Sequence, residues 1–159
     1  MNTADITASL TALFSELVDG APKTGAYMLN RGDPGMLRSL DRLSAVAASA
    51  KIAAHVDHVR YGLSLMNRWA NGEPNPFATA DWNAAWRRTH VSDAEWADLR
   101  GALRDEAHRW LQALGKPREV DDVALNGMIG SIAHLAYHLG AIRQIDQTTR
   151  GPAEPQLNQ

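Results

Sequence analysis

The chain has 159 residues, with 16 Lys and Arg against 18 Asp and Glu, six histidines and no cysteine. This length predicts one domain with a sizeable core, and the missing cysteines exclude disulfides, thiolate metal ligands and thiol nucleophiles. A net charge of −2, spread along the chain, disfavours nucleic-acid binding.

The first predicted helix covers residues 4–18, and Thr3 or Asp5 is expected to cap it. It has an apolar stripe at helical spacing, made by Ile6, Leu10, Leu13, Phe14 and Leu17. The first eighteen residues contain no Lys or Arg, unlike a secretory signal or a transit peptide, so we expect a cytoplasmic protein. Gly20 and Pro22 then open an irregular connector.

Residues 36–50 predict a short helix and a bend, followed by a second main helix from about Lys51 to the Asn71-Gly72 pair. Residues 80–89 are expected to form one or two helical turns, with Trp82 and Trp86 on the same side. Ser92 and Glu95 match a capping box, which opens a third helix that ends at Gly115. The third helix is expected to face inward with Trp96, Leu99, Leu103, Ala107, Trp110, Leu111 and Leu114.

The fourth helix is expected to begin at Asp121 or Asp122 and to run to about Thr149. Residues 1–150 then form a single domain, and residues 151–159 a flexible C-terminal tail. No strand-like alternation lasts and no repeat occurs. The sequence therefore predicts an all-α four-helix bundle with long connections.

The stretch Val123–Ile142 contains no Asp, Glu, Lys or Arg, and its length would suit a membrane span. Three glycines and several polar residues, among them His134 and His138, dilute its apolarity, so we favour the buried helix of a soluble bundle. Four residues along a helix turn by roughly 400°, which places these two imidazoles on one face.

His55 lies on the apolar stripe of the second helix. Together with His134 and His138 it can meet one metal ion between two antiparallel helices, leaving positions for water or substrate. Hydrogen-bonded core histidines are the alternative. His58 lies one turn on, whereas His90 and His108 are expected to be solvated.

Gly62, Gly127 and Gly130 border the faces that carry these histidines. Each glycine inside a helix costs about 1 kcal/mol relative to alanine, which suggests a cavity over the metal. Close packing of two helix backbones explains the glycines equally well. Leu135 stands where a HExxH zinc protease has its glutamate, which disfavours peptidase chemistry.

The segments IAAHVDHVRYGL and SIAHLAYHLGAIRQI resemble the DinB-like, or YfiT-like, family of four-helix bundles. The resemblance covers most of residues 3–150. It implies that His55, His134 and His138 bind one divalent metal such as Zn or Ni, and that the chain forms a homodimer. His58 receives no family role; it is a supporting group or a fourth ligand. Members include metal-dependent hydrolases and transferases that use bacillithiol, mycothiol or glutathione-like thiols.

The leading hypothesis is therefore a metal-dependent hydrolase or thiol transferase that acts on a small molecule, with neither nucleic acid nor membrane as partner. Weaker candidates to orient the substrate are Tyr61, Asn67, Tyr137 and Arg143. One alternative is a metal-stabilised binding or stress-response module without turnover, and another is a metal-free helical dimer with buried histidines. An open cleft lined by the three glycines would favour catalysis. A site sealed by Trp or Leu side chains would favour a structural metal.

Overall fold

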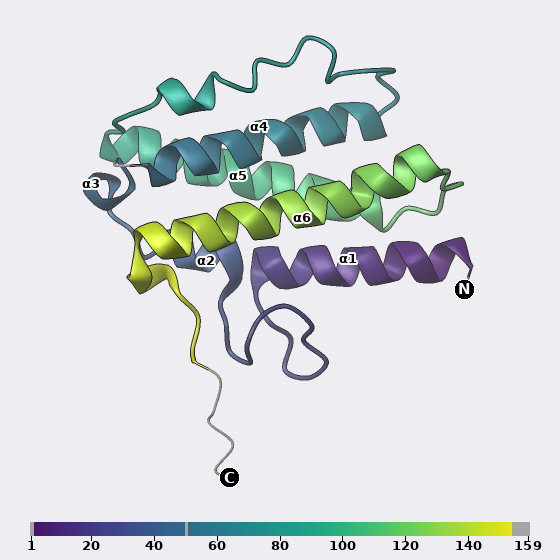
Figure 1. Ribbon diagram of the computed structural model, residues 1–159, viewed down its shortest axis with the longest axis horizontal. Helices are drawn as coiled ribbons and strands as arrows, with labels where there is room; N and C mark the ends of the chain where they lie inside the picture. The colour runs from purple at the N-terminus through teal and green to yellow at the C-terminus, as the bar shows by residue number, and fades with distance from the viewer. Residues whose placement is uncertain (1, 50, 154–159) are drawn as a thin grey trace.

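The computed structural model describes residues 2–49 and 51–153, and within these ranges it is all-helical. Four long helices form the bundle in Figure 1: α1 (Thr3–Asp19), α4 (Ile52–Ala70), α5 (Asp93–Leu114) and α6 (Asp122–Ile145). Short helices occupy the connections and the C-terminal end: α2 (Gly35–Leu40), α3 (Ala45–Ala48), η1 (Ala85–Arg87) and η2 (Gln147–Thr149). The all-α prediction is confirmed for the described residues.

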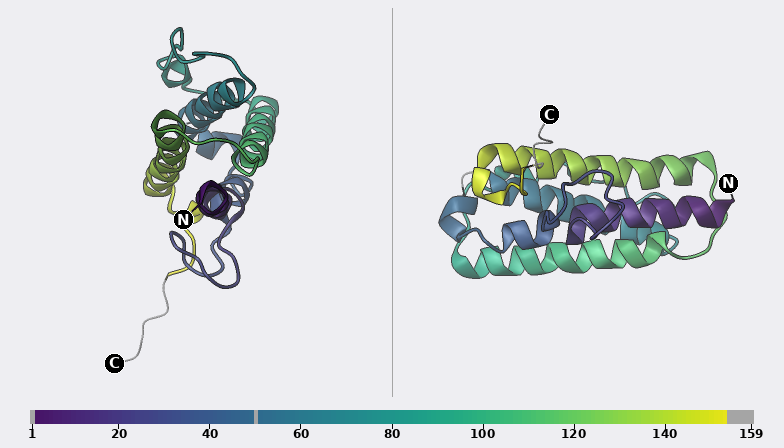
Figure 2. Two further views of the ribbon diagram at one scale, coloured as in Figure 1. Left: turned by 90° about the vertical axis from the view of Figure 1, so that its right-hand side faces the viewer. Right: turned by 90° about the horizontal axis from the view of Figure 1, so that it is seen from below.

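The order of the helices around the bundle creates one long crossover. α4 packs against α5 and α6, and α1 packs against the same two helices. α4 and α5 run in the same direction, opposite to α1 and α6 (Figures 1 and 2). Because α4 and α5 are parallel, residues 71–92 must carry the chain back along the length of the bundle, and they do so over the outer side of α4.

The core is built from the apolar stripes that the sequence predicts. On α5 the inward residues are buried as expected, apart from Leu111, which is partly buried. Both buried tryptophans find acceptors, because Trp96 Nε1 donates to the Leu43 carbonyl at 2.9 Å and Trp110 Nε1 donates to Ser131 Oγ at 2.9 Å. Polar atoms carried into this part of the core are therefore satisfied.

Two predicted helix ends differ from the structure. Asn2 caps α1 in place of Thr3 or Asp5, because its side chain accepts from the Asp5 amide while the Asp5 carboxylate accepts from the Asn2 amide. α6 ends at Ile145, short of the predicted Thr149, since the extended residue Asp146 starts the separate turn η2. The capping box of Ser92 and Glu95 is confirmed.

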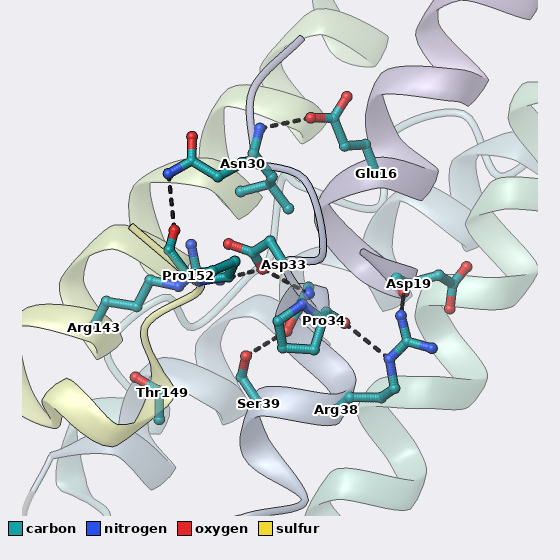
Figure 3. Close-up of polar contacts among 12 residues, drawn as sticks. Glu16, Asp19, Asn30, Asp33, Pro34, Arg38, Ser39, Arg143, Thr149 and Pro152 are labelled. Atoms are coloured by element: carbon teal, nitrogen blue, oxygen red, sulfur yellow. Dashed lines mark hydrogen bonds and ion pairs between the residues drawn. The ribbon is translucent and has the colours of Figure 1, made fainter. Parts of the chain in front are cut away.

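The connector between α1 and α2 is ordered by a buried carboxylate (Figure 3). Glu16 is 3% exposed, and its oxygens accept hydrogen bonds from the backbone amides of Tyr27, Met28 and Leu29, the last two at 2.7 and 2.6 Å. Three amide donors compensate for the loss of water around one charge. The loop therefore wraps around the end of α1.

A second buried carboxylate ties the connector to the C-terminal end of α6 (Figure 3). Asp33 pairs with Arg143 at 2.7 Å and accepts from the Gly35 amide at 2.9 Å. Asn30 Nδ2 also donates to the Pro152 carbonyl at 2.9 Å. Residues 151–153 of the expected flexible tail thus contact the connector, and residues 154–159 lie outside the described residues. In the described part of the chain, no helix has the length and apolarity needed to cross a membrane.

Candidate metal centre

Four imidazoles from α4 and α6 meet between the two helices. His138 is at the centre, with its Nδ1 2.8 Å from Nδ1 of His55 and its Nε2 3.0 Å from Nε2 of His134. The ring of His58 lies 5.0 Å from the rings of both His134 and His138, measured between centroids. His55 and His134 therefore each contact His138, and His58 is a fourth member of this histidine cluster.

One ring nitrogen each of His58, His134 and His138 lies within 4.8 Å of the other two. Nitrogens bound to the same ion at about 2.0–2.1 Å lie roughly 3 Å from one another, so the pair from α6 already has this spacing. His55 instead meets the opposite ring nitrogen of His138. The structure thus brings together three donors suited to a metal, and the predicted set with His55 as the third ligand stays a prediction.

Among the described residues, three buried side-chain nitrogens have no hydrogen-bond partner: Arg100 Nε, Arg143 Nε and, within the cluster, His58 Nδ1. Buried side-chain nitrogens in proteins nearly always have a partner, so an exception calls for an explanation. A ligand or ion beside His58 would supply one, and this orphaned atom is the feature of the donor set that best fits a bound metal.

The cluster is electrically neutral near pH 7. Burial, and after it the neighbouring His134, His55 and His58, together lower the pKa of His138 to about 3. Burial is also the main cause that lowers the pKa of His55, His58 and His134 below the ordinary value. Neutral imidazole is the form that binds metal ions.

Two tryptophans of the α4–α5 crossover lie over the cluster. Trp86 packs at 5.0 Å from His55 and 5.1 Å from His58, and Trp82 packs at 5.6 Å from His58, all between ring centroids. Tyr61 Oη accepts from the Asp81 amide at 3.2 Å, which fixes the crossover to α4. The sequence predicted a shared side for the tryptophans but missed this contact; the presence of two tryptophans in the connection between α4 and α5 was the available signal.

A cavity of about 410 Å³ opens beside the cluster, with His58 and His134 in its wall. Gly62, Gly127 and Gly130 line it, as the sequence predicted. A Cβ atom on Gly62 would lie 3.3 Å from Cε1 of His134, whereas a Cβ on Gly130 would meet nothing within 4 Å. Both explanations of the glycines therefore apply: Gly62 allows close packing, and Gly130 leaves open space.

The remaining candidates divide into those near the cluster and those engaged elsewhere. Tyr137 is 70% exposed and its ring lies 5.0 Å from that of His138. Asn67 instead donates to the backbone carbonyl and carboxylate of Glu106, which joins α4 to α5. Arg143 is held by Asp33 at the end of α6.

The two histidines expected to be solvated differ. His90 is exposed, whereas His108 Nε2 lies 3.1 Å from an Asp19 carboxylate oxygen at the surface. A smaller cavity of about 270 Å³ is lined by His55 and Trp86 together with Lys51 and Arg88, and Arg88 pairs with Asp57.

No protein-family model, curated protein or solved structure matches this chain. The resemblance to the DinB-like family therefore stays a prediction, and the functional argument depends on the geometry of the histidine cluster and its cavity.

Proposed function

We propose that the histidine cluster holds a divalent ion such as Zn²⁺ or Ni²⁺, and that the chain is a metal-dependent hydrolase or thiol transferase acting on a small molecule. One observation carries the proposal: neutral imidazoles from two helices meet in the wall of a cavity of about 410 Å³. This volume lies within the range of about 300–1,000 Å³ that is typical of small-molecule sites.

We assign His58, His134 and His138 as the ligands and His55 as a positioning residue. His55 touches His138 Nδ1, and metal-bound histidines commonly use their second nitrogen for such an orienting contact. The family resemblance implies His55 as the third ligand instead. In the structure His55 and His134 contact opposite nitrogens of the His138 ring, so a histidine ring would have to turn before His55, His134 and His138 could bind one ion. The two assignments make different predictions for His55 and His58.

The chemistry of the site follows from its surroundings. A bound divalent ion would lower the pKa of a water molecule or a thiol cosubstrate and so supply a nucleophile near neutral pH. Trp82 and Trp86 restrict the access of water to the imidazoles, and Gly130 leaves room for a substrate. Because the imidazoles are neutral, no proton has to leave them before an ion binds.

Metal analysis of protein purified without an affinity metal tests the proposal. We expect one ion per chain in the unaltered protein and in His90→Ala, a control on an exposed histidine. His134→Ala and His138→Ala should lose the ion. Equal metal in the unaltered protein and His138→Ala would contradict the proposed site.

Separate titrations of His55→Ala and His58→Ala with Zn²⁺ and a competing chelator distinguish the two ligand sets. Loss of an orienting contact weakens metal binding by about 10–100-fold, which is the result expected for His55→Ala. His58→Ala should weaken binding by more than that. The reverse order would establish the set of His55, His134 and His138.

Catalysis itself is tested by chelation. Hydrolysis of an uncharged ester, or addition of a thiol to an uncharged electrophile, should stop with chelator and return with one divalent ion. The tryptophan cover gives some support to the second candidate function, a metal-stabilised binding or stress-response module. That module would bind the ion with the same affinity and show no chelator-sensitive turnover with either substrate type.

We also propose a homodimer, as the resemblance implies. α6 presents an uncharged outer side with Val123, Ile129 and Tyr137 exposed, and exposed apolar residues of this kind favour association. Sedimentation of the unaltered protein should show a dimer that Tyr137→Lys dissociates. A monomer at all concentrations would contradict this proposal.

A further inference from the structure

The cavity beside the histidines continues along α4 and α6. A second cavity of about 330 Å³ lies beyond it, against Trp69 and Pro74. Met66, Phe77 and Gly127 line both cavities, so the two form one groove under the crossover. From His58 to Trp69 an α-helix rises by about 16 Å, which gives the groove an elongated shape with the histidines at one end.

The groove lacks charged side chains. None of the residues that line either cavity is Asp, Glu, Lys or Arg. Ser131 Oγ in the wall already donates to the Met128 carbonyl and accepts from Trp110. An ionised ligand buried here would lose its hydration without a compensating charge. At the histidine end, His58 Nδ1 has no hydrogen-bond partner among the described residues, and at the Trp69 end Asn75 is the polar residue of the wall.

Gly127 stands at the junction of the two cavities. A Cβ atom there would lie 3.6 Å from Met66 Cε, so a larger side chain would occupy the passage. Gly130, one turn on, has open space in the first cavity. Substituting Gly127 should therefore block the passage between the cavities, and substituting Gly130 should fill the histidine end.

We propose that this groove binds an elongated, uncharged molecule with an alkyl or aryl chain, whose polar head meets the histidine cluster and whose chain passes Gly127 toward Trp69. The chain-binding part stands on the groove itself, and the reaction of the head rests on the proposed function. An uncharged groove with histidines at one end therefore indicates a substrate class: a lipophilic molecule with one reactive polar end.

Binding to the metal-free protein tests the groove. The probe is N-phenyl-1-naphthylamine, an uncharged dye that fluoresces in apolar sites, displaced by alkan-1-ols from butan-1-ol to decan-1-ol. Burial of each methylene should tighten binding about fourfold until the chain fills the groove. Decanoate should bind roughly tenfold more weakly than decan-1-ol, because its charge is buried without a partner. Equal affinity for butan-1-ol and decan-1-ol, or for decan-1-ol and decanoate, would overturn the proposal.

Three glycine substitutions locate the chain. Gly127→Leu should end the gain in affinity at a shorter alkanol, and Gly130→Leu should weaken alkanols of every length. Gly101→Leu is the matched control, since Gly101 lies inside α5 with nothing within 4 Å of a Cβ atom, and it should leave all affinities unchanged. If Gly127→Leu fails to fold, Gly130→Leu still tests whether the alkanols occupy the groove. Identical displacement curves for Gly130→Leu and Gly101→Leu would overturn the proposal.

Failure of this inference and failure of the proposed function are distinguishable. A protein that binds Zn²⁺ but shows no chain-length dependence overturns the groove alone. A protein that binds alkanols but loses no metal with His138→Ala overturns the metal site alone. In the zinc-loaded protein, decanoate should gain affinity relative to decan-1-ol, because its carboxylate reaches the ion. An unchanged ratio would overturn the placement of the polar head.

Discussion

Two regions of the molecule bury polar side chains, and they treat them differently. Around the connector, Glu16 and Asp33 each find several partners within the chain. In the histidine cluster the imidazoles mainly contact each other, and His58 Nδ1 has no partner among the described residues. The hydrogen-bonded carboxylates stabilise the fold, whereas the histidine cluster is held in place by the fold. Arg143 Nε, in the side chain that pairs with Asp33, also lacks a hydrogen-bond partner among the described residues. The two regions therefore differ in what holds the polar groups: backbone amides and an arginine hold the carboxylates, whereas the imidazoles hold one another.

The largest effect on stability should come from the buried carboxylate that orders the connector. Glu16→Ala removes the acceptor of three part-buried backbone amides and should lower the free energy of unfolding by about 3–5 kcal/mol. Urea denaturation measures the change. Glu119→Ala, on an exposed glutamate, serves as the control and should change it by less than about 0.5 kcal/mol. Similar values for the two variants would show that the connector does not depend on the buried carboxylate.

The histidine cluster should stabilise the fold only when it is loaded. Zn²⁺ at a hundred times its dissociation constant should raise the free energy of unfolding by about 2.7 kcal/mol, because the ion binds the folded chain. Thermal or urea unfolding with and without chelator measures this. The gain should vanish in the double variant His134→Ala, His138→Ala, and a gain that persists there would place the ion elsewhere.

In the metal-free protein, the free energy of unfolding should depend on pH through the buried histidines of the cluster. Burial holds the pKa of His138 at about 3, while the unfolded chain takes up this proton near the ordinary value of 6.5. Stability is therefore full above about pH 6.5 and falls as the pH drops toward 3, by up to about 1.4 kcal/mol per pH unit. Urea titrations between pH 7 and 5 should show a shallower slope for His138→Asn, and parallel slopes would contradict this cause.

The smallest effect should come from His58→Phe in metal-free protein. The variant removes the orphaned nitrogen and keeps a flat ring against Trp86, so the free energy of unfolding should change by less than about 1 kcal/mol. The same variant should abolish stabilisation by Zn²⁺. A loss above 2 kcal/mol without metal would mean that His58 serves the fold directly.

Much of the fold followed from local patterns. The apolar stripes, the capping box at Ser92 and the glycine and proline breaks predicted four long helices, because each signal acts within one or two turns. The proximity of His134 and His138 followed from helix geometry, whereas the glycines left a cavity and close helix packing open as explanations until the structure showed the cavity. Residues four apart on a helix share a face whatever surrounds them.

The missed features depend on contacts between distant segments. The sequence placed Trp86 in a turn, but its contact with His55 depends on the parallel arrangement of α4 and α5. The burial of Glu16 likewise depends on the path of residues 27–29, which carries no periodic signal. The choice between His55 and His58 depends on the contact of His55 with His138 Nδ1 and on the grouping of His58 with His134 and His138. Helical spacing does not specify ring orientation, so the sequence could not make this choice.

The crossover has a consequence for how such a protein can diversify. Pro74, Phe77 and Trp82 of the crossover line the groove. Residues 71–92 run along the outside of α4, leaving α4 at one end of the bundle and entering α5 at the other (Figure 1). Loops that run over a surface tolerate changes of sequence and length with little thermodynamic penalty. The ligand preference that we propose for the groove can therefore be changed within one contiguous segment while the helices beneath keep their packing. Grafting a foreign crossover onto this scaffold is accordingly a practical route to new selectivities.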